Sequence, residues 1–147
     1  MTIKTATLNG VATIEIARPE KKNALTQAMY TAMAEALVAA TADTAVRAVL
    51  ITGAGKGFCS GADLAARGEA SPIQQKGGSH LALQNHYNPL ITQIMRAPVP
   101  VVTAVNGAAA GVGCSIALAG DFVMAAKSAY FLQAFVNIGL VPDGGST

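Results

Sequence analysis

The chain has 147 residues, of which 52% are hydrophobic and only 12% are charged, and its ten basic and eight acidic side chains give a net charge of +2. This length fits one domain, and the composition is far from that of disordered or fibrous chains. The basic residues are scattered without a run of five, which argues against a nucleic-acid footprint, and the apolar runs are much shorter than the roughly 20 residues of a bilayer span. Because the N-terminus also lacks the apolar stretch of a signal peptide, we expect a cytoplasmic protein.

The first part of the chain predicts a hairpin followed by a helix. Two alternating runs, residues 5–8 and 11–16, flank Asn9-Gly10, the strongest short signal for a β-hairpin. Thr26 then fits a helix N-cap. Four apolar side chains follow it at helical spacing and predict a helix that packs on the core: Met29, Met33, Leu37 and Ala40.

The middle of the chain predicts two buried strands with a loop between them. Residues 47–55 and 97–107 are apolar, rich in β-branched side chains and closed by glycines, as in parallel strands. Residues 65–84 are polar and glycine-rich over their first half, which favours a mobile loop that could cover a site.

After this loop, Asn88-Pro89 predicts a helix start, with an N-cap followed by proline at the first helical position. One face of that helix should carry four apolar residues: Leu90, Ile91, Ile94 and Met95. Residues 111–118 predict a tightly packed helix of small residues, and residues 121–126 a further strand that Asp121 ties down where it begins. This order of elements predicts an α/β fold in which right-handed crossovers join parallel strands.

Two cysteines, Cys59 and Cys114, lie far apart among apolar or small residues, and no CxxC pair occurs. This pattern favours two reduced, buried thiols over a disulfide framework or a metal site.

Two glycine-rich turns follow the predicted strands, "GAGKGFCSGADL" and "NGAAAGVGCSIALAG". In a parallel sheet both turns could face one ligand crevice. A nucleotide-binding P-loop is excluded because Lys56 is followed by Gly57, and the dinucleotide pattern GxGxxG is also missing from the sequence. For each turn alone, a structural role of the glycines is the simpler interpretation.

Together, four motifs in this order resemble the crotonase family of enoyl-CoA hydratases and isomerases: "RPEKKNALT", "ITGAGKGFCSGADL", "PVPVVTAVNGAAAGVGCSIALAGD" and "GLVPDGGST". The resemblance covers nearly the whole chain and implies the crotonase-like (ClpP/crotonase) spiral of ββα units. Residues 1–147 would form its N-terminal core domain, without the C-terminal helical region of the family. The family also implies acyl-CoA thioester substrates and a homotrimer or a dimer of trimers. It implies no permanently bound cofactor and no metal, since coenzyme A arrives as part of the substrate.

The resemblance further implies an oxyanion hole made by the backbone N–H groups of Ala62 and Val112. Loss of a proton beside a thioester places negative charge on its carbonyl oxygen, and a preorganised donor aimed there is worth about 3 kcal/mol. By the same comparison, the coenzyme A arm would be bordered by Lys22 (or Lys21), Ser60, Ala62, Asp63, Leu64 and Ala65. Two of these assignments have plain alternatives: Asp63 also suits a helix N-cap, and the lysines a solvated basic pair.

Hydratases of this family use two glutamates, and the matching positions here hold Ser115 and Phe135, neither of which can exchange a proton at neutral pH. The sequence therefore contradicts the standard hydratase mechanism. The motif "GLVPDGG" instead resembles isomerases of the family, including the ring-epoxide isomerase of phenylacetyl-CoA breakdown, in which the aspartate is the base. Asp143 would then carry a proton between C2 and C4 of the acyl chain of an enoyl-CoA.

Several alternatives remain open at this point. Pro-Asp-Gly-Gly is also a favourable turn in its own right. His80 and His86 are rival proton carriers, although we expect both near the surface. A non-catalytic or truncated subunit that binds CoA thioesters, and an atypical enoyl-CoA hydratase, are the alternative functions.

Overall fold

The computed structural model describes residues 2–63 and 78–145. It opens with the predicted hairpin, in which β1 (Ile3–Leu8) and β2 (Val11–Ile16) pair antiparallel. Asn9 and Gly10 form its two-residue turn with φ of 51° and 80°. Positive φ at both positions matches the right-handed twist of the flanking strands, which explains why this dipeptide is placed here.

The first long helix, α1 (Gln27–Ala42), begins directly after Thr26 as predicted. The Thr26 side chain makes no capping hydrogen bond, however, so its predicted role as a hydroxyl cap is wrong. The buried face carries the predicted Met29, Met33 and Leu37, together with Tyr30.

The main sheet has the order β1-β2-β3-β4-β6, and every pair from β2 onward is parallel. Its later strands are β3 (Ala48–Gly53), β4 (Val101–Val105) and β6 (Phe122–Ala125). The predicted parallel strands and α/β class are therefore confirmed. As predicted, Asp121 ties down the edge of the sheet, since its Oδ2 accepts a 2.8 Å hydrogen bond from the N–H of Val101.

A second, two-stranded parallel sheet pairs β5 (Ala108–Ala110) with β7 (Tyr130–Leu132) and was not predicted. Three successive alanines carry no β signal, so the pairing of β5 with β7 reflects tertiary contacts and not residue propensity.

The helical segment that precedes β4 differs most from the prediction. The helix α2 (Gly78–Ala82), the π-helical turn η3 (Leu83–Tyr87) and α3 (Asn88–Met95) follow one another without a break. The predicted short helix is present as α3, with Pro89 in its first turn. Asn88 is itself helical, however, with φ −62° and ψ −40°, so its predicted role as the N-cap is wrong. Proline has no N–H, so Pro89 would interrupt the backbone hydrogen bonds of a regular α-helix. The wider π-helical turn in front of Pro89 changes this pattern of hydrogen bonds.

The same segment revises two further expectations. Residues 78–84, the end of the predicted loop, are helical, whereas residues 64–77 lie outside the described part. Leu90, Ile91 and Ile94 are buried as predicted, but Met95 is 67% exposed.

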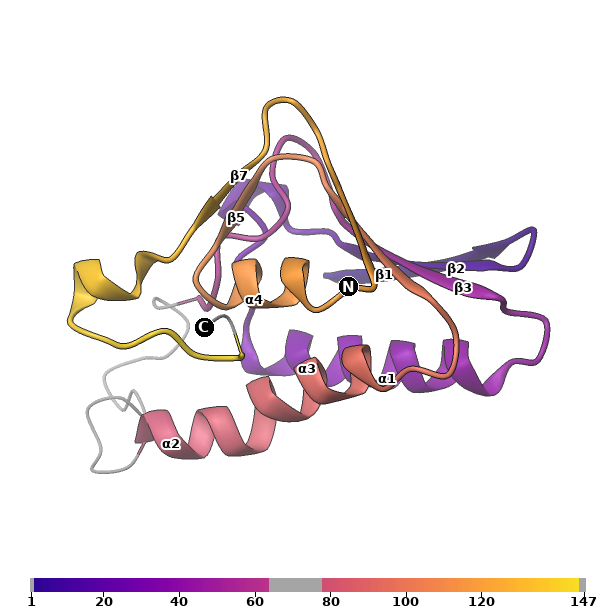
Figure 1. Ribbon diagram of the computed structural model, residues 1–147, viewed down its shortest axis with the longest axis horizontal. Coiled ribbons are helices and arrows are strands. Elements are labelled where there is room, and N and C mark those ends of the chain that lie inside the picture. The colour runs from indigo at the N-terminus through magenta and orange to yellow at the C-terminus, as the bar shows by residue number, and fades with distance from the viewer. Residues whose placement is uncertain (1, 64–77, 146–147) are drawn as a thin grey trace.

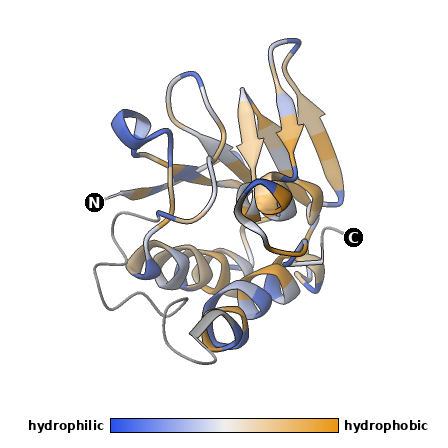
Figure 2. Cartoon of the chain, turned by 90° about the vertical axis from the view of Figure 1, so that its left-hand side faces the viewer, coloured by the Kyte–Doolittle hydropathy of each residue, from blue (hydrophilic) through white to orange (hydrophobic). Residues whose placement is uncertain are grey.

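In Figure 1, α1 and α3 lie below the main sheet, and α4 (Val112–Leu118) lies beside the strands and above α3. The helix α1 packs on β1, β2 and α3, and α4 packs on β4 and β5. Figure 2 shows α4 end-on as an apolar helix enclosed by these elements, and six of its seven residues are buried. Short 3₁₀ helices among the described residues are η1 (Pro19–Lys21), after β2, and η4 (Ala134–Ile138), after β7. Within the described ranges, no helix is long and apolar enough to cross a membrane.

Candidate functional site

The turns that follow β3 and β4 are joined by backbone hydrogen bonds. Cys59 and Ala109 form a parallel bridge. The carbonyl of Cys59 accepts a 2.9 Å bond from the N–H of Ala110, and the N–H of Cys59 donates to Ala108 at 3.0 Å. The two glycine-rich turns therefore meet at the carboxyl edge of the sheet, as the sequence predicted.

Glycines make this close approach possible, and two of them, Gly61 and Gly113, lie beside the predicted oxyanion donors. Gly61 has φ +98°, and a Cβ there would lie 2.9 Å from the carbonyl oxygen of Ala110. A Cβ at Gly113 would overlap the carbonyl oxygen of Cys59. Any side chain at either position would push the two turns apart.

The predicted oxyanion donors, Ala62 and Val112, lie directly beside these contacts. The N–H of Leu25 donates to Gly61, and its carbonyl accepts from Asp63, both at 2.8 Å. In such a parallel bridge the N–H of Ala62 points to the opposite side, away from Leu25.

The second donor is the first N–H of a helix. Val112 begins α4 after Gly111, which has φ +53°. The first N–H groups of a helix have no partner inside it. In the described part of the chain, neither the N–H of Ala62 nor that of Val112 has an acceptor. The oxyanion hole itself stays a prediction, for which the two turns supply backbone donors that no described acceptor uses.

Asp143, the predicted base, is held against the same helix. Ser115 lies one turn after Val112 and is 2% exposed, and its Oγ donates a 3.0 Å hydrogen bond to the main-chain carbonyl of Asp143. Gly144 is buried against Ser115, and the Oδ1 atom of Asp143 is itself buried. The turn with the carboxylate therefore packs on the helix that presents one of the predicted donors.

A pocket of about 280 Å³ opens beside this turn. It is lined by Ile91, Met95, Ser115, Leu118, Ala119, Gly120, Asp121, Gly144 and Gly145. Most of these side chains are apolar or absent, so the pocket suits an apolar group better than a charged one.

The two positions that match the hydratase glutamates are both buried and carry no acid. Ser115 uses its hydroxyl to hold the Asp143 turn, and Phe135, in η4, is 6% exposed. General acid and base catalysis by a glutamate pair is therefore not possible at these two positions.

The structure brings together some of the residues that were predicted to border coenzyme A. The carbonyl of Lys22 accepts a 3.1 Å bond from the N–H of Ser60, and the side chains of Lys21 and Lys22 are exposed. Asp63 is engaged elsewhere, because its Oδ2 lies 2.6 Å from Nη1 of Arg18. Leu64 and Ala65 lie outside the described residues. The set as a whole remains a prediction.

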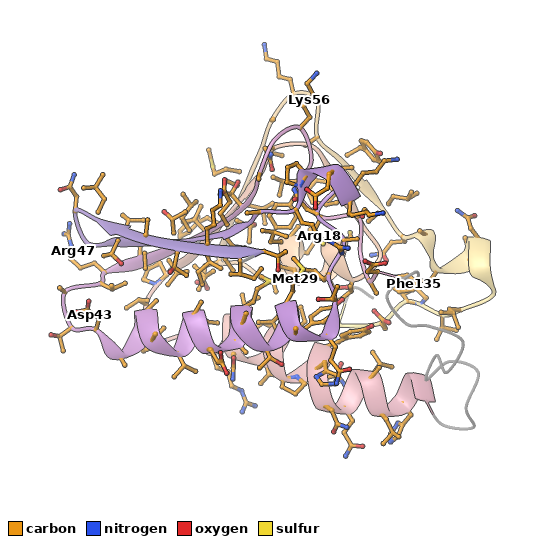
Figure 3. The ribbon with its side chains drawn as sticks, turned by 180° about the vertical axis from the view of Figure 1, so that it is seen from behind. Arg18, Met29, Asp43, Arg47, Lys56 and Phe135 are labelled. Atoms are coloured by element: carbon orange, nitrogen blue, oxygen red, sulfur yellow. The ribbon has the colours of Figure 1, made fainter. Side chains whose placement is uncertain are left out.

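Sequence reasoning missed Arg18, which lies at the start of the motif "RPEKKNALT". An arginine in front of a turn with charged residues suggests a surface charge. Its side chain is in fact only 17% exposed, and it lies in the interior in Figure 3, whereas Lys56 projects outward.

Burial makes both cysteines poor nucleophiles. Both are free thiols, as the sequence predicted. Desolvation raises the pKa of Cys59 to about 12 despite a hydrogen bond from the backbone of Gly61, and it also raises the pKa of Cys114. Both thiols are therefore protonated at neutral pH.

The rival proton carriers lie away from the two turns. His80 is exposed on α2, and the half-buried His86 has its Nε2 2.7 Å from Nε2 of Gln27. Within residues 2–63 and 78–145, no group of three or more His, Cys, Asp or Glu side chains could hold a metal ion.

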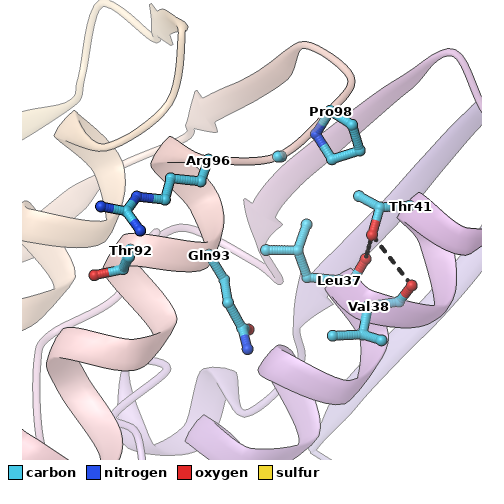
Figure 4. Close-up of a pocket in the computed structure, with 8 residues that line it drawn as sticks. Leu37, Val38, Thr41, Thr92, Gln93, Arg96 and Pro98 are labelled. Carbon is cyan, nitrogen blue, oxygen red and sulfur yellow. Dashed lines mark hydrogen bonds between the residues drawn. The ribbon is translucent and has the colours of Figure 1, made fainter.

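A second pocket, of about 240 Å³, lies between α1 and α3 (Figure 4). Leu37, Val38 and Thr41 line one side of it, and Thr92, Gln93 and Arg96 the other. The Thr41 hydroxyl donates back to the carbonyl of Leu37 at 2.9 Å, so its hydrogen atom is used within α1. None of the predicted site residues lines this pocket.

Comparison with known sequences decides the family. The sequence pattern of the enoyl-CoA hydratase/isomerase family matches residues 6–147. The chain belongs to this family. The resemblance predicted from the four motifs is thereby confirmed.

Two curated relatives of this family member show how close the match is. The chain is 43% identical over 138 residues to the 1,2-epoxyphenylacetyl-CoA isomerase of Escherichia coli. This match covers 94% of the chain and 52% of that relative. The chain is also 45% identical over 146 residues to a protein of Rhodobacter capsulatus named "Probable enoyl-CoA hydratase". This match covers 99% of the chain and 54% of that relative. The chain therefore spans about half the length of the curated relatives that it matches.

A solved structure confirms the crotonase-like fold. An enoyl-CoA hydratase from Polaromonas sp. JS666 superimposes with a TM-score of 0.88 at 39% identity, over 97% of this chain and 55% of that one. The chain is thus similar in sequence to relatives named isomerase and hydratase, and its architecture is shared with a solved structure of the family.

Proposed function

We propose that the protein is an enoyl-CoA isomerase that shifts a double bond along the acyl chain of a CoA thioester. The observation that carries this proposal is the bond from Ser115 to Asp143. Ser115 stands at a position that holds a glutamate in hydratases. Here it anchors the turn that bears Asp143, the acid that matches the isomerase motif. The relatives include a protein named as a CoA-thioester isomerase, which supports isomerisation in general.

The reaction needs one base and one stabilised oxygen. Asp143, ionised, takes a proton from C2 of a 3-enoyl thioester, and the electron pair of that C–H bond moves into the thioester to give a dienolate. The N–H groups of Ala62 and Val112 stabilise its negative oxygen. The protonated Asp143 then gives its proton to C4 while electrons return from the oxygen. The product has a C2–C3 double bond, and the carboxylate is regenerated.

Two properties of the site favour isomerisation over hydration. Hydration needs a water molecule activated by acid and base groups on one face of the double bond. Ser115 and Phe135 are buried and carry no carboxyl group, and the Ser115 hydroxyl already donates to a backbone carbonyl. One carboxylate, in contrast, is sufficient for a double-bond shift.

The experiment uses purified protein and a 3-enoyl-CoA such as 3-hexenoyl-CoA, with the products separated by chromatography. We expect the 2-enoyl isomer to form, and Asp143→Asn to lower kcat by about 10²- to 10⁴-fold while CoA affinity is retained. The matched control is Asp43→Asn, because this exposed carboxylate accepts a hydrogen bond from the N–H of Ala45 beyond the end of α1. We expect this control to leave kcat unchanged.

Two results would contradict the proposal. If the unmutated protein binds CoA thioesters without converting them, the chain belongs to a non-catalytic binding subunit. If a 3-hydroxyacyl-CoA accumulates instead, the protein is an atypical hydratase and water activation must come from groups other than the two matched positions.

A further inference from the structure

A short segment, residues 18–25, is fastened along the turn that carries Ala62. Asn23 is fully buried and has φ +57°. Its Nδ2 donates to the carbonyls of Ala54 at 2.9 Å and Gly57 at 2.8 Å, while its Oδ1 accepts from the N–H of Arg18 at 2.9 Å. We call residues 18–25 the anchor segment. Its amide holds the first half of the turn, from position 54 to position 57.

The second half of the turn is held by the backbone and by one ion pair. Leu25 bonds the residues on both sides of Ala62. Immediately after Ala62, Oδ2 of Asp63 accepts a 2.6 Å hydrogen bond from Nη1 of Arg18. The same guanidinium nitrogen donates to the carbonyl of Ala24 at 3.1 Å.

Both members of this pair are well removed from solvent. The side chain of Arg18 is 17% exposed and that of Asp63 is 9% exposed. An ion pair at this depth is screened little by salt. Without Asp63, the guanidinium of Arg18 would keep only the more distant carboxylate of Glu20, whose Oε1 lies 3.9 Å from Nε. The pair therefore fixes the backbone of Asp63 firmly and with it the orientation of the preceding peptide.

We propose that Arg18 and Asp63 are positioning residues, which act together to aim the N–H of Ala62 at the thioester carbonyl. This proposal rests on the proposed function, in which that N–H stabilises an enolate. A preorganised donor loses much of its effect when it is displaced by about 1 Å, and such a shift can cost about a hundredfold in rate. The Arg18–Asp63 pair prevents that displacement.

The same pair argues against direct contact between Asp63 and coenzyme A. One carboxylate oxygen already accepts from Arg18, and the side chain is nearly inaccessible. Coenzyme A carries several phosphate charges, and a carboxylate would repel them. Asp63 contributes to the site through the backbone instead.

The test compares Asp63→Asn, Arg18→Met and Arg18→Lys with the unmutated protein, and Asp43→Asn serves as the control for a remote carboxylate. The first readout is kcat and KM for a 3-enoyl-CoA. The second is the infrared stretch of the thioester carbonyl in bound ¹³C-labelled hexanoyl-CoA, which cannot isomerise. Donors that polarise the carbonyl lower this frequency, so the spectrum reports on the oxyanion hole without any turnover. Thermal unfolding of each variant shows which of them fold.

We expect Asp63→Asn and Arg18→Met to lower kcat by about 10- to 100-fold with KM changed by less than about threefold, and to abolish most of the carbonyl shift. Arg18→Lys keeps the charge and should recover part of both. It also keeps the test decisive if Arg18→Met fails to fold.

Opposite results are easily recognised. A raised KM with an unchanged carbonyl shift would make Asp63 a coenzyme A contact and overturn the inference, as would variants with unaltered kcat and spectrum. If the unmutated protein shifts the carbonyl frequency but does not isomerise its substrate, the proposed function fails while the positioning role stands. If the unmutated protein produces no shift at all, Ala62 is not an oxyanion donor and the inference falls.

Discussion

The hydroxyl of Ser115 and the main-chain carbonyl of Asp143 are joined by a 3.0 Å hydrogen bond across 28 residues of sequence. Ser115 belongs to α4, whose first residue is Val112, and Asp143 belongs to the last turn that the structure describes. One bond thus connects the helix that presents a predicted oxyanion donor to the turn that carries the predicted base.

Removal of this bond should reduce activity more than stability. For Ser115→Ala we expect a loss of about 1 kcal/mol in the free energy of unfolding, the usual contribution of one neutral hydrogen bond. We also expect kcat to fall about tenfold or more, because the base would no longer be held in place. Urea unfolding and isomerase kinetics measure the two effects.

The matched control is Thr41→Val, which removes another hydroxyl that donates to a backbone carbonyl, here within α1. It should cost similar stability and leave kcat unchanged. An active Ser115→Ala variant with normal kcat would show that the turn does not depend on this bond.

Alanine substitutions at Gly144 and Gly145 distinguish backbone strain from a steric clash with Ser115. Both have positive φ, +59° and +73°, so alanine at either should cost about 1–2 kcal/mol in backbone strain. At Gly144 the new Cβ would also lie 3.0 Å from Cβ and Oγ of Ser115, whereas at Gly145 it meets nothing within 4 Å. Gly144→Ala should therefore be the less stable and less active variant. Equal melting temperatures and equal kcat for the two would contradict the described packing of the turn.

Gly113 tests the contact between the two glycine-rich turns. A Cβ there would overlap the backbone of Cys59, so Gly113→Ala must force the turns apart. We expect a loss of about 1–3 kcal/mol in stability, as for other overpacked interiors, and a large drop in kcat. Gly57→Ala is the control, since a Cβ at that position meets nothing within 4 Å. A fully active Gly113→Ala variant would place the oxyanion donors elsewhere.

The buried thiol of Cys59 makes stability depend on pH in the alkaline range. Its pKa is raised by burial from 9.0 to about 12. Between these values the unfolded chain releases the thiol proton while the folded chain keeps it, so the stabilising contribution present below pH 9 is lost as the pH rises. The free energy of unfolding should fall by about 1.4 kcal/mol per pH unit in this window.

The measurement is the difference in unfolding free energy between the unmutated protein and Cys59→Ala at several pH values from 8 upward, roughly across the titration range of a thiol. The difference should shrink as the pH increases. A difference that is constant over the whole range would mean that Cys59 ionises in the folded protein as it does in the unfolded chain.

Local signals in the sequence predicted a large part of the fold. Asn9-Gly10 fixes the hairpin because few other residues accept positive φ at both turn positions. Periodicity placed α1 and the buried strands, since the apolar spacing reflects which face is covered. Asn88-Pro89 marked the beginning of α3, but a local helix-start signal does not reveal that a helix already arrives from Gly78 through a π-helical turn.

The candidate site was predictable only where a motif carried it. Glycine patterns marked both turns, but the ion pair of Arg18 with Asp63 joins residues 45 positions apart and leaves no periodic signal. The short strands β5 and β7 were missed for a similar reason, because they pair with each other across a long stretch of sequence and the propensity of alanine does not indicate a strand.

The strand register also has a kinetic consequence. Ile14 is paired with Ile51, and Ile51 with Thr103, so the sheet is closed by contacts between distant parts of the chain. Hairpins form in about 1–10 μs, whereas pairings between distant segments must first overcome the entropy of closing long loops. We therefore expect β1 and β2 to be in place early and the crevice between the two turns to be completed last. A nascent or refolding molecule would hold its hairpin well before it could bind a thioester.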